Sequence, residues 1–283
     1  PGHRGDALAK GRWWAVCEDA DLDALETQAV DANPSIAAAA ARLAAARGAL
    51  TVAGAAAYPR ATLGADAVRQ RVPAGVSGLT EPIVTHAEDL QVTVSYELDI
   101  FGARQRSIES AEAGVQAADA DLNNARLLVT AEVASDYFRL RQLDTEIGVL
   151  DATVGALKEG LRVIRARHDR GIASGLDVAQ EEALLEATGT QATLARQQRE
   201  QLVHALAVLA GKPAPRFAVP VRPLPPKVPA VPPVLPSELL ERRPDVASAE
   251  RRVAAANAAI GVARAAYFPS IGASAGGGFP GSP

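Results

Sequence analysis

The sequence contains one cysteine, no methionine and few aromatic residues, which make up 4% of its 283 positions. The single cysteine, Cys17, cannot form an intrachain disulfide or a cysteine cluster for a metal ion. Basic residues number 29 against 33 acidic ones, so the net charge of −4 excludes the positive footprint of a nucleic-acid-binding domain. The longest uncharged helical stretch, roughly residues 48–59, is shorter than the ~20 apolar residues of a membrane-spanning helix. We therefore expect no such helix.

Patterns typical of catalytic and metal sites are also missing. The four histidines are scattered and lack the spacing of a helical zinc site: His3, His86, His168 and His204. Acidic residues are abundant, but in helices they more often form solvated faces than acid–base pairs. We expect no enzyme activity, no cofactor and no metal site.

Alanine dominates the residues that are present, with 61 of 283 positions. It is the best helix former, and its small side chain lets two backbones approach closely. A compact globular core is usually filled by larger side chains. The composition therefore predicts long, closely packed helices.

The most informative feature is an internal repeat. Residues 34–59 match residues 244–269 at 13 of 26 positions, and the prolines that bound the two segments share one offset of 210 residues. Because alanine inflates the identity, the prolines and the large apolar residues carry the argument. We interpret the chain as a duplicated unit of about 210 residues with an incomplete second copy.

Heptad spacing marks the first helices. Apolar residues from Leu22 to Ala57 recur at alternating steps of three and four, which is typical of a coiled coil. Asn33 followed by Pro34 resembles an N-cap with proline at the first helical position, so a break is expected there. The pattern predicts a helix over 34–58.

At Pro59 the period changes to two, which predicts strands over about 60–72 and 88–99. One face of the second strand is apolar and is expected to meet lipid: Leu90, Val92, Val94, Tyr96 and Leu98. The other face is polar and is expected to line a wet lumen: Gln91, Thr93, Ser95 and Glu97. Pro59, Gly102 and Pro269 mark the junctions between helix and strand.

A single seven-residue apolar register, from Ile108 to Ile164, predicts one helix over about 103–168, roughly 100 Å long. A tip at 169–176 and a second helix over about 176–209 complete an antiparallel hairpin. The tip sequence is Arg170, Gly171, Ile172, Ala173, Ser174, Gly175, Leu176 and Asp177. Gly171 is a natural helix end, and Ser174 with Asp177 resembles a capping box.

Ten of the nineteen prolines lie between Pro213 and Pro236, which predicts an extended connector over 212–236. The chain thus divides into an N-terminal segment, 1–33, a first repeat, 34–211, the connector, and the start of a second repeat, 237–283. That start comprises a helix over about 237–268 and a truncated strand. The predicted fold class is mainly α with a small β part, in which long antiparallel coiled-coil hairpins join amphipathic membrane strands.

Five motifs resemble the TolC-like outer-membrane efflux proteins, and more narrowly their lipoprotein branch in tripartite multidrug efflux systems. They are Tyr96–Gly102 (YELDIFG), Ala131–Phe138, Arg170–Val178, Leu206–Gly211 and Leu240–Ala247. The resemblance covers nearly the whole chain. It implies a homotrimer in the outer membrane of a Gram-negative bacterium, with four strands per protomer in a twelve-stranded barrel and a periplasmic tunnel of helices. It also implies that the tip docks to a periplasmic adaptor protein, and that an inner-membrane transporter completes the assembly.

The chain also departs from that family pattern. Its second repeat stops where the first strand should form, so we expect a truncated protomer that does not close a barrel. A start at Pro1 indicates a processed form or a fragment. Cys17 lies too deep in the chain to be the lipid-bearing cysteine of the lipoprotein branch. The family's narrowest aperture falls largely in the missing part of the second repeat.

The resemblance implies passive conduction of exported small molecules, such as drugs and toxic compounds, driven by an inner-membrane pump. One alternative is the outer-membrane conduit of a type I protein secretion system. Another, from a different class, is a periplasmic coiled-coil adaptor or scaffold, which predicts no amphipathic strands and solubility without detergent. The lack of methionine and the few histidines argue against a copper or silver exporter.

Overall fold

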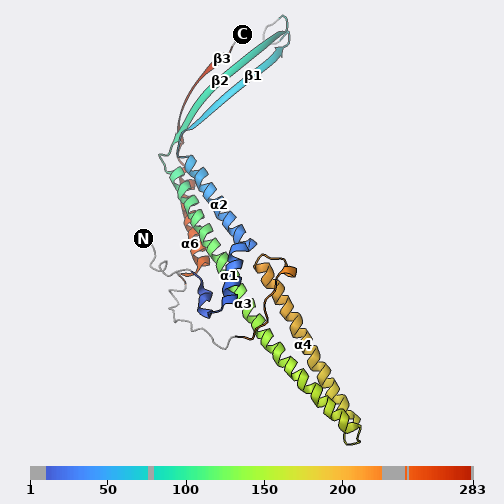
Figure 1. The fold of residues 1–283 in the computed structure, drawn as a ribbon. Coiled ribbons are helices and arrows are strands. Elements are labelled where there is room, and N and C mark those ends of the chain that lie inside the picture. Colours follow the sequence, from blue (N-terminus) through green and yellow to red (C-terminus); the bar gives the residue numbers. More distant parts are fainter. Residues whose placement is uncertain (1–10, 76–79, 225–239, 241, 282–283) are drawn as a thin grey trace. The chain divides into compact units, whose positions relative to one another are not determined.

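The computed structural model describes residues 11–75, 80–224, 240 and 242–281. These residues form long helices and one three-stranded sheet (Figure 1). The chain divides into two compact units. Unit 1 comprises Pro1–Ala41 and Ala120–Val246, and unit 2 comprises Arg42–Asp119 and Ala247–Pro283.

The elements follow one another as short and long helices interrupted by strands. In chain order they are η2 (Trp13–Cys17), α1 (Ala20–Ala32), α2 (Pro34–Ala55), β1 (Arg60–Val72), β2 (Ile83–Leu98), α3 (Ala103–His168), α4 (Gly175–Leu209), η3 (Ala214–Arg216), α6 (Pro244–Ala265) and β3 (Ile271–Gly281).

The break between α1 and α2 occurs at Asn33, as the sequence predicts. The Asn33 side-chain oxygen accepts hydrogen bonds from two backbone N–H groups in the first turn of α2, at 2.8 and 3.4 Å. Its amide nitrogen donates to the Leu209 carbonyl at the end of α4, at 3.0 Å. Gly211 follows with φ +64°, and a Cβ there would lie 2.6 Å from the Ala32 carbonyl oxygen. Only glycine therefore allows the end of α4 to pack so closely against the end of α1.

The bounds of α2 and α6 reproduce the internal repeat of the sequence. Helices α2 and α6 both have 22 residues, and both of their ends are offset by 210 positions. Each ends three residues before the predicted bound, because the last residues before the proline form a tight turn. In these turns Tyr58 N–H donates to the Ala55 carbonyl, and Phe268 N–H donates to the Ala265 carbonyl.

The second-copy helix was predicted from residue 237, and in the structure α6 begins at Pro244. Residues 237–239 and 241 lie outside the described residues, as do residues 225–236 of the predicted connector. The described part of the connector contains η3, a turn of 3₁₀ helix that an extended segment does not predict.

Helix α2 contradicts the expectation that no helix has the length and composition of a membrane span. It has 22 residues, and an 18-residue window within it reaches a mean hydropathy of 1.3. The value is high because alanine raises it, while Arg42 and Arg47 remain inside the helix. A charge at the depth of the hydrocarbon is costly, so we assign no membrane crossing to α2.

The core of unit 1 lies where α1 and η2 meet the middle of α3. Trp14, Leu22, Ala134 and Tyr137 form a buried cluster, against which Cys17 packs half-buried. Burial and two neighbouring carboxylates raise the pKa of the Cys17 thiol. The thiol therefore stays protonated and behaves as a small apolar group.

The middle of α3 is buried on more than the predicted seam. Leu122 and Val129 of that seam are buried, whereas most of its other members are only half-buried. A second set of residues is buried over about three turns where α1 and the connector cover the helix: Val133, Ala134, Tyr137, Leu140, Arg141 and Asp144. A heptad pattern reveals the helix face that packs against one partner, but it does not reveal a second buried face.

Candidate functional sites: the amphipathic sheet and the helical hairpin

The three strands form one antiparallel sheet in the order β1-β2-β3 (Figure 1). Strand β2 begins at Ile83, five residues before the predicted start. Backbone pairing continues to Val72 opposite Ile83, although the alternation of apolar and polar residues ends near Leu90. The strand is therefore longer than its amphipathic part.

The register gathers the apolar residues of all three strands on one face. Leu90 lies opposite Ala65 and Phe279, and Val92 lies opposite Leu63. Further matched pairs are Val94 with Ala61 and Ala275, Tyr96 with Ala273, and Leu98 with Ile271. The four polar residues Gln91, Thr93, Ser95 and Glu97 point to the opposite face, because side chains alternate along a strand. The sheet is amphipathic as a whole.

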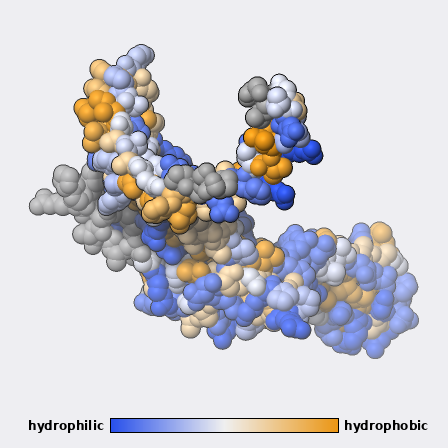
Figure 2. Space-filling model, turned by 90° about the horizontal axis from the view of Figure 1, so that it is seen from above, coloured by the Kyte–Doolittle hydropathy of each residue, from blue (hydrophilic) through white to orange (hydrophobic). Residues whose placement is uncertain are grey.

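This apolar face is uncovered within the described residues. Leu90, Val92, Val94 and Leu98 are 41 to 47% exposed, and no residue of the sheet whose burial is described counts as buried. Figure 2 shows patches of hydrophobic residues, in orange, on the surface that it displays. Soluble monomers seldom leave a large apolar surface open, so the face requires a cover from outside the described residues.

The apolar band has the dimensions of a membrane crossing. From Leu90 to Leu98 there are eight steps of roughly 3.4 Å, about 27 Å along the strand. Transmembrane β-strands take about 9–11 residues at a tilt of about 45°, and Leu90 to Leu98 supply nine. Strands β1 and β3 each have one edge without a neighbouring strand among the described residues. Unpaired edges are not tolerated in lipid, so further strands are required.

The junction of β2 with α3 is fixed by polar contacts around Gly102. The Asp99 carboxylate accepts from the backbone N–H groups of Arg104, at 3.1 Å, and Gln105, at 2.9 Å. The Arg104 side chain pairs with Glu97 at 2.9 Å and donates to the Ala56 carbonyl. These contacts cap the first turn of α3 and join it to the end of α2. Pro59 and Pro269 lie between helix and strand in the two copies, directly before and two residues before the strand.

The hairpin of α3 and α4 reverses at the predicted tip. Gly171 has φ +74°, a left-handed conformation that favours glycine. Its N–H donates to the His168 carbonyl at 2.8 Å, and the Ile172 N–H donates to the Arg167 carbonyl at 2.9 Å. This pair of hydrogen bonds is a Schellman motif, which satisfies the last carbonyls of α3. The helix therefore ends at the residue that the sequence indicates.

The start of α4 has the predicted capping box. Ser174 Oγ accepts from the Asp177 N–H at 3.2 Å, and the Asp177 carboxylate accepts from the Ser174 N–H at 2.9 Å. The second of these hydrogen bonds lowers the pKa of Asp177. Helix α4 begins at Gly175, one residue before the predicted start. Ile172 and Leu176 are 72 and 67% exposed, so the tip presents apolar side chains to its surroundings.

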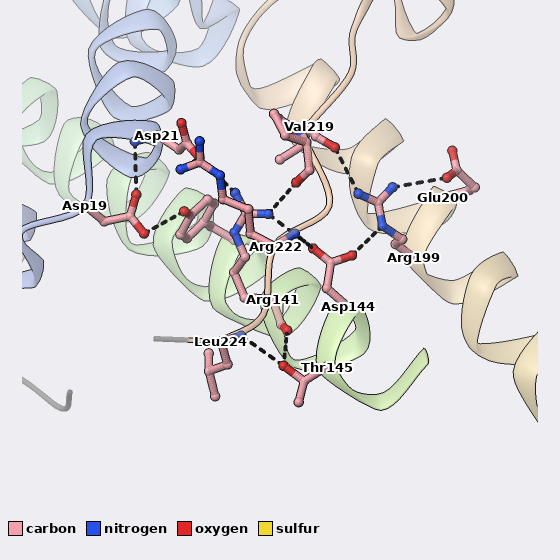
Figure 3. A network of polar contacts seen from close by, with 12 residues as sticks. Asp19, Asp21, Arg141, Asp144, Thr145, Arg199, Glu200, Val219, Arg222 and Leu224 are labelled. Atoms are coloured by element: carbon pink, nitrogen blue, oxygen red, sulfur yellow. Dashed lines mark hydrogen bonds and ion pairs between the residues drawn. The ribbon is translucent and has the colours of Figure 1, made fainter. Parts of the chain in front are cut away.

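A buried charge network, which the sequence patterns did not indicate, joins α3 and α4 away from the tip. Figure 3 shows Arg141 of α3 and Arg199 of α4 approaching Asp144 from two sides. Arg199 Nε lies 2.6 Å and Arg141 Nη1 lies 3.1 Å from the Asp144 oxygens. The Asp144 side chain is fully buried, contrary to the expectation that helix carboxylates are solvated. A buried carboxylate between two guanidinium groups is stable only because all of them are paired.

The same network holds the connector against the hairpin. The Arg222 N–H donates to Asp144 at 3.0 Å, and the Leu224 N–H donates to Thr145 Oγ1 at 2.9 Å (Figure 3). The Val219 carbonyl accepts from Arg199 at 2.9 Å. Residues 219–224 are therefore docked on α3 and α4. In the sequence, Asp144 lies 3 positions after Arg141 and 55 positions before Arg199. Such separations between acidic and basic residues are common by chance, so they could not have indicated the network.

Glu26 of α1 is the second buried charge that the sequence did not reveal. It is 0% exposed, and both carboxylate oxygens lack a hydrogen-bond partner within the described residues. Burial raises the pKa of Glu26 to about 8. Glu26 is therefore largely protonated at neutral pH, since an ionised carboxylate without a partner is very costly to bury.

Comparison with known proteins identifies relatives of this chain. The model of the outer membrane efflux protein family matches residues 25–212 and 235–282. The pyoverdine export outer membrane protein OpmQ of Pseudomonas aeruginosa is 34% identical over 278 residues, which cover 96% of this chain and 59% of OpmQ. The toluene efflux pump outer membrane protein TtgF of Pseudomonas putida is 37% identical over 214 residues, which cover 75% of this chain and 44% of TtgF.

Among solved structures, the outer-membrane channel OprN matches with a TM-score of 0.84 and 28% identity, over 99% of this chain and 70% of OprN. The chain belongs to the outer membrane efflux protein family. The predicted family, fold class and outer-membrane location are thereby confirmed. The chain spans 44 to 59% of the length of these curated relatives.

Proposed function

We propose that this chain is part of an outer-membrane channel of a tripartite efflux system. The channel is a passive conduit for exported small molecules, and an inner-membrane pump supplies the energy. It binds no cofactor and catalyses no reaction. The observation that carries the proposal is the uncovered apolar face of a sheet whose two edges are open among the described residues.

The sheet supplies the membrane part of this channel. Leu90, Val92, Val94, Tyr96 and Leu98 face lipid, and Gln91, Thr93, Ser95 and Glu97 line the lumen. This assignment rests on polarity, because lipid accepts only the apolar face. Three strands cannot close a barrel, so closure takes a fourth strand per protomer and two further copies of the chain, giving a homotrimer with twelve strands.

The hairpin supplies the periplasmic part. Residues Arg170 to Asp177 form the tip that contacts a periplasmic adaptor protein. The exposed Ile172 and Leu176 support a contact there, because apolar side chains at a helix turn gain by being covered. The capping box keeps the tip in one conformation, which lowers the entropic cost of binding.

Small organic compounds are the proposed cargo. The relatives are named for export of pyoverdine and efflux of toluene, both small molecules. These names favour a drug or metabolite channel over the conduit of a type I protein secretion system. The amphipathic sheet argues against a periplasmic adaptor or scaffold, since neither needs a lipid-compatible face.

The test uses the full-length protein in a strain that lacks its own outer-membrane efflux channel. We expect the protein in the outer-membrane fraction, soluble only in detergent, and at least a fourfold increase in resistance to exported compounds when the cognate adaptor and pump are present. Ile172→Ser combined with Leu176→Ser, which keeps Gly171 and the capping box, leaves the membrane fraction unchanged and abolishes the resistance. Recovery of the intact protein as soluble periplasmic material would contradict the proposal.

A further inference from the structure

A cavity in unit 2 lies where the strands give way to helices. It has a volume of about 690 Å³, within the usual range for ligand pockets. Its walls come from the start of α3, the end of α6 and the turns beside them. Its lining includes Ile100, Phe101, Arg106, Glu109, Arg264 and Phe268.

The apolar wall of this cavity is a stacked aromatic pair. The rings of Phe101 and Phe268 lie 4.6 Å apart with an angle of 11° between their planes. Phe101 is 42% exposed, Phe268 is 55% exposed, and the adjacent Ile100 is 59% exposed. Two stacked rings with this much open surface form a rigid apolar platform that the described part of the chain does not cover.

The helical wall is cationic. Arg106 and Arg264 line it, and Glu109 is the one acid among the described lining residues, so the lining carries a net charge of +1. Arg106 pairs with Glu109 at 2.6 Å. The structure shows no ion pair between Arg264 and the other described residues. Gly261 provides space for the Arg106 chain, since a Cβ there would lie 2.7 Å from Arg106 Cγ.

From the strands to the helices, the residues change from apolar to aromatic to basic. A lipid at a membrane surface changes in the same direction, from its acyl chains to its phosphate. Leu98 and Ile271 end the apolar band, the aromatic residues follow, and the arginines come from the helices beyond. Aromatic and basic side chains take these positions at membrane interfaces, where rings meet the acyl chains and cations meet the phosphates. A guanidinium group binds a phosphate with two parallel hydrogen bonds.

We propose that this cavity is a binding site for an anionic glycerophospholipid of the periplasmic leaflet. Its phosphate is held by Arg264 and Arg106, and an acyl chain lies along Phe101 and Phe268. This proposal rests on the proposed function, because the cavity borders a lipid leaflet only if the sheet crosses the membrane. The bound lipid covers the aromatic pair and fixes the depth at which the strands end.

The test is native mass spectrometry of the full-length protein, delipidated in detergent and titrated with dioleoylphosphatidylglycerol. We expect the unchanged protein to retain this lipid and to prefer it over dioleoylphosphatidylethanolamine. Arg264→Gln weakens its retention at least threefold, and Arg106→Gln combined with Arg264→Gln weakens it at least fivefold. The matched control is Arg47→Gln on α2, which removes the same charge outside the cavity and changes retention less than twofold.

Two further measurements distinguish a bound lipid from a bound free phosphate or headgroup. Phe268→Ser weakens retention and Phe268→Leu preserves it, because an acyl chain needs an apolar wall. Glycerophosphoglycerol and inorganic phosphate at millimolar concentration do not displace the lipid. Displacement by either one, or equal retention by all arginine variants, would overturn the assignment.

The outer-membrane fraction of each variant is measured in parallel. A channel that reaches the membrane but retains lipid equally in all variants refutes the lipid site alone. An unchanged protein that never reaches the membrane refutes the proposed function. The two failures are therefore distinguishable.

Discussion

The middle of the helical hairpin and the sheet use their side chains in opposite ways. Around Tyr137 and Asp144 the chain buries aromatic rings, an aspartate and two arginines within its own fold. In the sheet, apolar residues such as Val92 and Leu98 remain more than two fifths exposed. The first region is stabilised by contacts that the chain supplies itself. In the proposed channel the second is covered by lipid and further strands, so its stability depends on surroundings outside the described residues.

The largest expected effect concerns the self-contained region. Asp144→Ala leaves Arg141 and Arg199 buried without their common partner and should destabilise the protein by about 3–5 kcal/mol. The measurement is the free energy of unfolding in denaturant. The matched control is Asp151→Ala, which breaks the half-exposed pair with Arg196 and should cost less than about 1 kcal/mol. Equal losses of unfolding free energy in the two variants would show that the buried network stabilises the protein no more than an exposed ion pair does.

The next effect concerns the sheet. Val94 lies at the middle of the apolar band, so Val94→Arg should cost about 2–4 kcal/mol in a lipid bilayer. Thr93→Arg, on the adjacent position of the opposite face, should cost about 1 kcal/mol or less because that side chain points into water. The folding free energy of the full-length protein in lipid vesicles compares the two. A larger loss for Thr93→Arg would reverse the assignment of the faces.

A third effect depends on pH. Because the pKa of Glu26 is about 8 in the folded protein and 4.5 when unperturbed, the folded state binds this proton more tightly than the unfolded state. The stabilising contribution is complete below pH 4.5 and is lost as the pH rises toward 8. Glu26→Gln should remove this pH-dependent loss, which amounts to about 3 kcal/mol between pH 5 and 8 because each unit of pKa difference corresponds to about 1.4 kcal/mol. Denaturation curves at both pH values check this, and parallel losses in the two proteins would refute it.

The smallest effect is at the tip. Ser174→Ala removes the side-chain cap of α4 and should destabilise the hairpin by about 1 kcal/mol. Thr190→Ala, farther along the same helix, removes a hydroxyl that caps nothing and should have a smaller effect. Hydrogen exchange of the first turn of α4 distinguishes the variants. Unchanged exchange in Ser174→Ala would mean that the tip is held by other contacts.

Local patterns predicted the elements well, for identifiable physical reasons. Gly171 and the Ser174–Asp177 pair act through their own backbone, so the residues themselves reveal the turn. The alternation from Leu90 to Leu98 reports one face of a strand directly. The repeat was recognisable because its bounding prolines end each helix in the same way.

The contacts between distant segments could not be predicted from those patterns. Asp144 and Arg199 are 55 positions apart, and the connector reaches Asp144 from 78 positions away. No periodicity links such residues, and an aspartate in a helix is usually solvated. The extra length of β2 was missed because backbone pairing does not require the alternation that revealed the strand.

The most direct measurement of the central claim is a labelling scan of β2. Each position from 90 to 98 is changed to cysteine in a Cys17→Ser background of the full-length protein in outer membranes, and a spin label at each site is tested for contact with oxygen and with a water-soluble paramagnetic reagent. We predict contact with oxygen at positions 90, 92, 94, 96 and 98, and contact with the aqueous reagent at 91, 93, 95 and 97. Equal access of the aqueous reagent to all nine positions would contradict a membrane-spanning amphipathic sheet.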